Sequence, residues 1–341
     1  MNTATISAEL PLIFTHIPKT AGMSLVAAFS DRWQDRVIDL YDMTDGDSPT
    51  TKRKLQYRQA AVYCGHFPHG LHQWLDRPCL YLSIVREPME RILSYYNFVS
   101  VYRKRCRHYL LTADQAAEQA LRRGRQLPNI SRILQRVATV VPKPGGMSYE
   151  DAMTWRQAEL LERFRIMGLP SYLDDFAPWI AGDDSLDTFL ACPSKELDNA
   201  MTRRFSGIGL QRARCTRQTF ELAQRNIEND YSLVGVKERY DETVALIREL
   251  FGAPWLLTQQ KNVSNHVNVN PVQASADITA QIAKRNRWDL ALYDWITERF
   301  QAMAGVPPRK RLRIVPGGAR TDYDQIPCWT GVGRMDAIRS A

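Results

Sequence analysis

Short apolar runs alternate along the chain with segments in which apolar residues recur at helical spacing. Three runs near the N-terminus predict buried strands: Leu10–Thr15, Ala61–Cys64 and Cys79–Val85. They are almost continuously apolar, as expected of parallel strands that are covered on both faces. Leu25, Phe29 and Trp33 follow the first run at helical spacing. The chain therefore opens with a strand, a loop and a helix.

The same alternation returns in the second half of the chain. Tyr231–Val236 has strand character, and the segment Glu242–Phe251 has helical periodicity. Asp241 is placed to cap that helix and Gly252 to end it. A last helix is predicted over about Thr279–Ala302. Strands that alternate with helices indicate an α/β fold with a largely parallel sheet.

The domain prediction follows from where this alternation stops. Residues 1–305 are expected to form one domain, with a helical insertion at about 102–190. Residues 306–341 contain several prolines and glycines without periodicity, so they are expected to form a C-terminal tail.

Three polar segments each follow a predicted strand. They are His16–Ser24, Gly65–His72 and Arg86–Ser94. The carboxyl ends of parallel strands meet at one edge of the sheet, where α/β proteins bind their ligands. We therefore expect the three segments to face a common crevice.

Composition narrows the class of protein and its partners. The chain has 341 residues, 44% hydrophobic and 24% charged, as is ordinary for globular proteins. Its longest apolar runs fall far short of the roughly 20 residues that span a bilayer, and no secretory signal is visible. Six scattered cysteines predict reduced thiols in a cytoplasmic protein. The net charge of +8 favours anionic partners, but no nucleic-acid recognition motif accompanies it.

The segment HIPKTAGMSL, residues 16–25, has the chemistry of a phosphate-binding loop. Free amides at a helix N-terminus attract anions, and Gly22 allows a close backbone approach. Lys19 adds a positive charge, and Thr20 and Ser24 add hydroxyl groups. The lysine precedes the glycine, so this is not the GxxxxGK[ST] triphosphate loop. A capped helix start with an incidental lysine is the alternative interpretation.

This segment resembles the 5′-phosphosulfate-binding loop of sulfotransferases that use 3′-phosphoadenosine 5′-phosphosulfate (PAPS), especially the carbohydrate branch with the heparan and uronyl 2-O-sulfotransferases. The resemblance implies an α/β fold with a P-loop-like parallel sheet. It also implies that Lys19 stabilises charge on the bridging oxygen. The residues that would hold the 5′ side of the nucleotide are Lys19, Thr20, Ala21, Gly22, Met23 and Ser24. Met23 stands where many relatives have threonine, so only its backbone amide would contribute.

A second motif, REPMERILSYYNF at residues 86–98, resembles the 3′-phosphate motif of the same family. Arg86 is able to donate two hydrogen bonds to a phosphate. The resemblance implies that Ser94 donates its hydroxyl to the same group. Glu87 replaces the commoner aspartate. An arginine that merely pairs with a neighbouring carboxylate is the alternative for Arg86. Weaker patches of resemblance suggest nucleotide or acceptor contacts from Arg203, Arg204 and Lys261.

The segment GHFPHGLH offers a candidate base. Neutral histidine is suited to taking a proton from an acceptor hydroxyl near neutral pH. The 2-O-sulfotransferases use a histidine in the corresponding region, so His66 is the expected base, with His69 second and His72 nearby on the acceptor side. A metal site is the alternative, but the segment lacks an obvious carboxylate partner and the HExxH pattern. The histidines could also be purely structural.

The resulting hypothesis is a sulfotransferase that moves a sulfuryl group from PAPS to a hydroxyl and releases PAP, without a metal. A saccharide or glycolipid is the expected acceptor. Two alternatives stay open at this point. One is a non-catalytic module of the same fold that binds PAP or glycan. The other is a different phosphate-loop transferase such as a small-molecule kinase.

Overall fold

The fold is known from a computed structural model that describes residues 5–41, 53–101, 103, 175–176, 179–180, 185–209, 214–256, 275–303, 306, 311–318 and 320. The chain divides into two compact units. The first comprises Met1–Tyr95 and Lys195–Gly331, and the second comprises Tyr96–Ser194 and Val332–Ala341. The predicted helical insertion at about 102–190 lies mostly outside the described residues. The predicted single domain over 1–305 stays a prediction.

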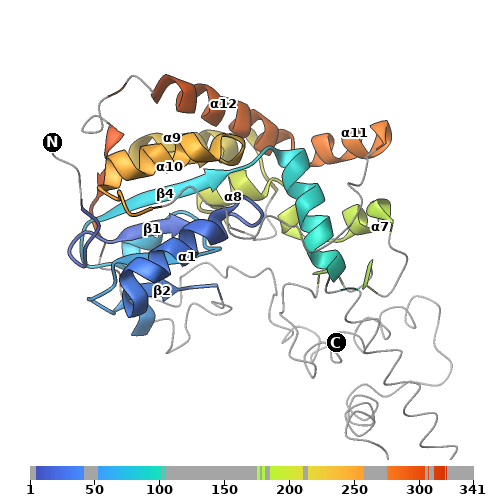
Figure 1. Ribbon diagram of the computed structural model, residues 1–341. Helices are drawn as coiled ribbons and strands as arrows, with labels where there is room; N and C mark the ends of the chain where they lie inside the picture. Colours follow the sequence, from blue (N-terminus) through green and yellow to red (C-terminus); the bar gives the residue numbers. More distant parts are fainter. Residues whose placement is uncertain are drawn as a thin grey trace, which may run out of the picture. The chain divides into compact units, whose positions relative to one another are not determined.

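The first unit is built on one sheet in the strand order β2-β3-β1-β4-β5, and β6 also pairs with β4 (Figure 1). The strands are β1 (Leu12–Thr15), β2 (Val37–Asp39), β3 (Val62–Gly65), β4 (Cys79–Val85), β5 (Tyr231–Val236) and β6 (Ile314–Val315). All pairs among β1 to β5 are parallel, and β6 runs antiparallel to β4. The predicted α/β fold with a largely parallel sheet is confirmed.

Burial explains which strands the sequence revealed. Every residue of β1, β3, β4 and β5 is buried, which is why each reads as an apolar run. The short edge strand β2 is half-buried to exposed, so its three residues carry no such signal. The sequence analysis missed it.

The strand order places a topological switch point between β1 and β4. After β1 the chain moves to β2 and β3 on one side, and after β4 it reaches β5 on the other side. In α/β proteins, ligands bind at the carboxyl ends of the strands at such a switch point, where adjacent connections leave in opposite directions. The segments after β1, β3 and β4 all lie at this edge of the sheet.

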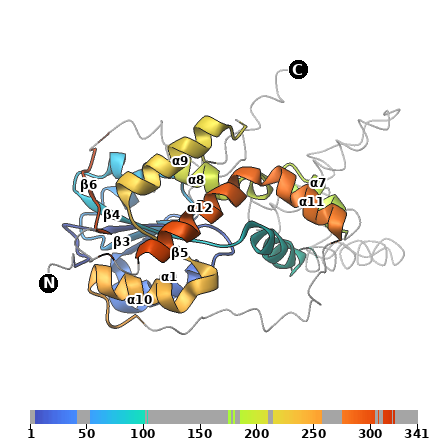
Figure 2. The same ribbon diagram turned by 90° about the horizontal axis from the view of Figure 1, so that it is seen from above.

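Helices cover both faces of the sheet. Their bounds are α1 (Gly22–Trp33), α8 (Ala200–Ser206), α9 (Arg217–Asp230), α10 (Tyr240–Phe251), α11 (Ala276–Arg285) and α12 (Arg287–Met303). Figure 2 shows α1 and α10 on one face and α8 and α9 on the other. Helix α12 packs against α8, α9 and β5. Among the described residues, no helix has the length and apolar character needed to cross a membrane.

Two details of the helix prediction were wrong. Helix α10 begins at Tyr240 with Arg239 at its N-cap, so Asp241 lies in the first turn rather than at the cap, while Gly252 ends the helix in a left-handed conformation as predicted. The single last helix is in fact two, because the chain breaks at Asn286 between α11 and α12. The Asn286 carboxamide accepts from Asn199 N at 3.1 Å and donates to Leu197 O at 3.1 Å. These long-range bonds fix the break.

The C-terminal tail returns to the core. In β6, Val315 pairs with Cys79 and Ile314 with Leu80. A few residues later, Gly318 N donates to His72 O at 3.0 Å. Residues 311–318 thus add a strand to the sheet, which the absence of periodicity in the sequence did not predict.

The second unit is described in part. Helix α7 (Leu186–Ala191) begins at Ser185, whose side chain accepts from Thr188 N. Trp179 lies 5.2 Å from Phe189 between ring centroids, and the Arg103 guanidinium lies 5.0 Å from the centroid of the Trp179 ring. This aromatic cluster forms a small core for the unit.

Among the described cysteines, Cys64, Cys79, Cys192 and Cys215 are free thiols.

Candidate functional site

The loop between β1 and α1 has the backbone of an anion-binding nest. Lys19 and Ala21 both adopt left-handed conformations, with φ of 71° and 67°. Such residues cost free energy and cluster at functional sites, and alternating left-handed and right-handed conformations point successive N–H groups at an anion. The Thr20 hydroxyl donates to Ile17 O at 2.8 Å and so closes the loop. A phosphate contact from Thr20 would therefore come from its amide.

Gly22 is required here by the close approach of His16. A Cβ at position 22 would lie 2.2 Å from His16 Cδ2, so the loop has no room for a side chain at this position. His16 is buried beneath the loop, and its Nδ1 lies 2.5 Å from the Tyr41 hydroxyl. Burial and the nearby His66, Arg204 and Lys19 lower the pKa of His16 well below its usual value. The ring is therefore uncharged, and it supports the loop by packing beneath it.

The two predicted phosphate-binding residues come together. Arg86 follows β4, and its Nη1 donates to the backbone oxygen of Lys19 at 3.3 Å. Burial and the charge of Arg86 lower the pKa of Lys19. Arg86 Nη2 also pairs with the exposed carboxylate of Glu90 at 3.0 Å, as the simpler interpretation of Arg86 anticipated. Two cations that meet at the switch point create a local positive potential that favours an anionic ligand.

The other predicted nucleotide-binding residues of the two motifs differ in how exposed their side chains are. Met23 is 45% exposed, so its side chain is not committed to the core. Ser24 is buried and shares a side-chain hydrogen bond with Tyr240 of α10. Ser94 is half-buried in the helix that covers residues 88–101. Lys261 lies outside the described residues, and its role stays a prediction.

His66 follows β3 and lies beside the loop. Its Nδ1 is 2.7 Å from the carbonyl oxygen of His16. A carbonyl only accepts, so Nδ1 carries the proton and Nε2 presents a lone pair. Burial and the neighbouring Arg204 lower the pKa of His66 to about 4, so the ring is neutral at pH 7. A half-buried, neutral histidine whose Nε2 carries a lone pair is chemically suited to accept a proton.

The other two histidines of the segment belong to a different cluster. His69 Nε2 lies 2.7 Å from Asp230 Oδ2 at the end of α9. The Tyr81 hydroxyl accepts from His72 N at 3.1 Å and lies 3.0 Å from His72 Nδ1. Burial lowers the pKa of His72 to about 4. The His69 ring thus contacts α9 and the His72 ring contacts β4. A contact of either ring with the acceptor stays a prediction.

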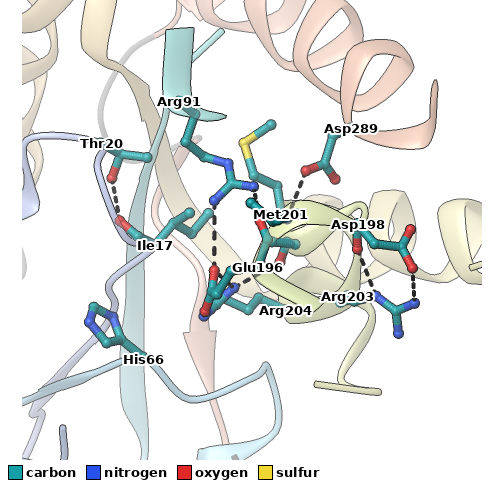
Figure 3. Close-up of polar contacts among 12 residues, drawn as sticks. Ile17, Thr20, His66, Arg91, Glu196, Asp198, Met201, Arg203, Arg204 and Asp289 are labelled. Atoms are coloured by element: carbon teal, nitrogen blue, oxygen red, sulfur yellow. Dashed lines mark hydrogen bonds and ion pairs between the residues drawn. The ribbon is translucent and has the colours of Figure 1, made fainter. Parts of the chain in front are cut away.

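A buried ion network joins the second motif to α8 (Figure 3). Glu196 lies between two arginines: its carboxylate pairs with Arg204 and with Arg91 Nη1 at 3.6 Å, and its backbone oxygen accepts from Arg91 Nη2 at 2.5 Å. Arg203 pairs with Asp198 at 2.8 Å. Both predicted contact residues on α8 are thus held by carboxylates, and their assignment to a ligand stays a prediction.

Sequence analysis missed Glu196, although it pairs with Arg204 and contributes to the electrostatics of His66. Burial alone would raise the pKa of Glu196, but Arg204 and Arg91 outweigh it and hold the pKa below its usual range. The carboxylate in turn raises the pKa of His66, against the opposing effect of Arg204. A single glutamate carries no spacing signal, so nothing in the sequence marked it.

The residues present fit a bis-anionic nucleotide. Arg86 Nε is buried, and among the described residues it meets no hydrogen-bond acceptor. The nest at Lys19 and Ala21 supplies amides, and the missing side chain of Gly22 leaves room for the buried His16 ring that supports the loop. Within the same described ranges, no group of three or more His, Cys, Asp or Glu residues is arranged to hold a metal ion.

Comparison with known proteins adds one positive finding. Residues 2–170 match a family model described as the sulfotransferase family. This match supports membership of the sulfotransferase family. No curated protein matches the chain. The matched segment contains Lys19, His66 and Arg86, whereas the buried ion network at Glu196 and Arg204 lies beyond it.

We predict that Glu196→Gln lowers the free energy of unfolding by about 3–5 kcal/mol. The substitution leaves Arg204 as a buried charge without its carboxylate partner. Chemical denaturation at neutral pH measures the effect. The folded-state pKa of Glu196 is depressed, so the carboxylate's contribution is present above its unfolded pKa and is lost as the pH falls through the folded value. The difference in the free energy of unfolding between wild type and Glu196→Gln should therefore become smaller as the pH is lowered.

Glu221→Gln is the matched control. Glu221 pairs with Arg217 at 2.9 Å on the surface of α9, where the two side chains are 42% and 83% exposed. Its removal should change stability by no more than about 0.5 kcal/mol. Equal effects of the two substitutions would contradict a special role for the buried network.

Proposed function

We propose that the protein transfers a sulfuryl group from PAPS to a hydroxyl of a saccharide or glycolipid and releases PAP. The observation that carries the proposal is the meeting of Lys19 and Arg86 at the switch point of the sheet, where Arg86 Nη1 donates to Lys19 O at 3.3 Å. One residue comes from the loop after β1 and the other from the end of β4. An adenosine nucleotide with phosphate at both its 3′ and 5′ positions matches two neighbouring cationic sites.

In this proposal each end of the donor has its own set of residues. The nest at Lys19–Ser24 holds the 5′ side through backbone amides and the Lys19 ammonium. Arg86 and Ser94 hold the 3′-phosphate, with Arg86 Nε as a donor that has no acceptor among the described residues. Lys261 is proposed as a further nucleotide contact. PAPS, when bound, supplies the sulfuryl group.

His66 is proposed as the general base. Its Nδ1–H is held by the His16 carbonyl at 2.7 Å, so Nε2 takes the proton from the acceptor hydroxyl as that oxygen attacks sulfur. Lys19 stabilises the negative charge that develops on the phosphate oxygen as the S–O bond to it breaks. The hydrogen bond to His16 fixes the tautomer and ties the base to the loop that holds the donor.

The acceptor is proposed from charge and family resemblance. The chain carries a net charge of +8, which favours an acidic glycan or an anionic head group near the crevice. The resemblance of both motifs to the carbohydrate branch favours a sugar hydroxyl. Incubation with radiolabelled PAPS and a panel of glycans and glycolipids tests this: label transfer to a saccharide supports the proposal, and transfer to none of the hydroxyl compounds contradicts it.

Lys19→Ala should reduce the thermal stabilisation that PAP gives the wild-type protein. The reason is that the substitution removes the ammonium group of the nest, and at a fixed ligand concentration a weaker ligand raises the melting temperature less. Differential scanning fluorimetry with PAP, ADP and ATP measures it, and PAP should stabilise the wild type most. Lys284→Ala, at an exposed position of α11, is the control. Equal stabilisation by ATP and PAP would favour a kinase-like enzyme instead.

His66→Ala should bind PAP with near wild-type affinity but lose turnover by about a hundred- to ten-thousand-fold, the usual contribution of a positioned base. Calorimetric titration with PAP separates binding from catalysis. Added imidazole should restore part of the lost rate in His66→Ala and none in Lys19→Ala. Undiminished turnover in His66→Ala would remove His66 from the reaction and favour a different base.

The pH dependence of the rate should reflect the low pKa of His66. Burial, aided by Arg204, lowers this pKa from 6.5 to about 4, so the base is unprotonated throughout the neutral range and is lost only in strong acid. We therefore expect kcat/KM to show no inflection near the ordinary histidine pKa and to fall as the pH approaches about 4. An acid limb centred near 6.5 would show that His66 is not the titrating base.

A further inference from the structure

A cavity of about 320 Å³ lies on the first unit among α9, β5, α12 and the segment that leads into β6. None of its lining residues belongs to the phosphate loop, the Arg86 motif or the His66 segment. Its floor is apolar: Ile227, Val234, Ile296 and Phe300 line it and are all buried. The cavity is therefore separate from the proposed sulfuryl-transfer site and has an apolar interior.

Arg311 is the polar residue that distinguishes this cavity. Its side chain lines the cavity and is only 4% exposed. One nitrogen, Nη2, pairs with Glu249 Oε2 at 2.8 Å. Within the described part of the chain, Nε and Nη1 are buried without a hydrogen-bond partner. Buried donors without acceptors are costly, so a native structure that contains them calls for an acceptor.

The other charges at the cavity are mostly positive. Arg299 and Arg313 line it together with Arg311, against one lining carboxylate, Glu228. Glu228 is engaged by Arg299 at 2.9 Å, and its backbone oxygen accepts from Arg313 Nε at 3.3 Å. The lining therefore has a surplus of positive charge next to an apolar floor, which favours a ligand with one anionic end and one apolar end.

We propose that this cavity binds an anionic amphiphile, with its carboxylate on the free donors of Arg311 and its alkyl chain against Phe300 and Ile296. The ligand is small. At the roughly 30 Å³ that a water molecule occupies in the liquid, the cavity has room for on the order of ten non-hydrogen atoms. A medium-chain fatty acid such as octanoate matches this size, the apolar floor and the single buried guanidinium.

Isothermal titration with three probes tests the pairing of head group and chain on the full-length protein. Octanoate should bind. 1-Octanol, which lacks the charge, and acetate, which lacks the chain, should each bind at least about 10-fold more weakly, since the first loses a charge-assisted hydrogen bond and the second loses the apolar contact. No heat of binding with millimolar octanoate at either of two temperatures, about 10 and about 35 °C, or equal binding of octanoate and acetate, would overturn the proposal.

Two variants place the binding in this cavity. Arg311→Met removes the guanidinium and keeps an apolar side chain, and it should weaken octanoate binding by about 10- to 100-fold. Ala302→Trp adds bulk at an exposed lining position of α12 and should also weaken it, without disturbing the core. Arg217→Met, an exposed arginine on α9 that does not line the cavity, is the matched control and should bind as wild type.

The test remains decisive even if one of the two variants does not fold. Circular dichroism and thermal melting check that each variant is folded, and Ala302→Trp decides the test if Arg311→Met is not. Octanoate affinity that is unchanged in the folded variants would place the binding elsewhere and overturn the proposal. PAP titrated into Arg311→Met should bind as in wild type, because this cavity does not include Lys19 or Arg86.

Discussion

The carbonyl oxygen of His16 connects the two halves of the candidate site. It accepts from His66 Nδ1 at 2.7 Å, and the amide of the same residue donates to Gly65 O at 2.9 Å. The backbone of this single residue therefore fixes the end of β3 against the end of β1 and decides which His66 nitrogen carries the proton. The His16 ring fills the space beneath Gly22. The proposed roles of His66 as base and of the loop as donor-binding nest depend on this arrangement.

Apolar runs and polar segments were sufficient to predict the main features of the fold. Strands β4 and β5 were predicted at their observed bounds, because both are buried throughout and interrupted by no charge. The three polar segments lie at one edge because parallel strands all point the same way. The sequence also indicated that Lys19 and Arg86 would lie at one edge of the sheet, since each follows a strand that was predicted to be parallel to the others.

What the sequence did not reveal depends on contacts between distant residues. Asn286 breaks the last helix because its carboxamide bonds to Leu197 and Asn199, about which local periodicity carries no information. Glu196 became visible as part of the site only when Arg91 and Arg204 were seen around it. Likewise, Arg311 Nε and Nη1 were seen to lack a partner among the described residues only once α12 and β5 were placed around them.

Strand β4 has partners that are made at very different times during synthesis. It pairs with β1 from the start of the chain, with β5 from the second half and with β6 close to the C-terminus. A ribosome-bound chain that has completed β4 therefore exposes an apolar strand with one open edge until β5 emerges. Such late closure predicts slow folding and a need for chaperone protection of nascent chains. Tags or truncations that disturb residues 311–318 would act on the sheet itself rather than on a loose end.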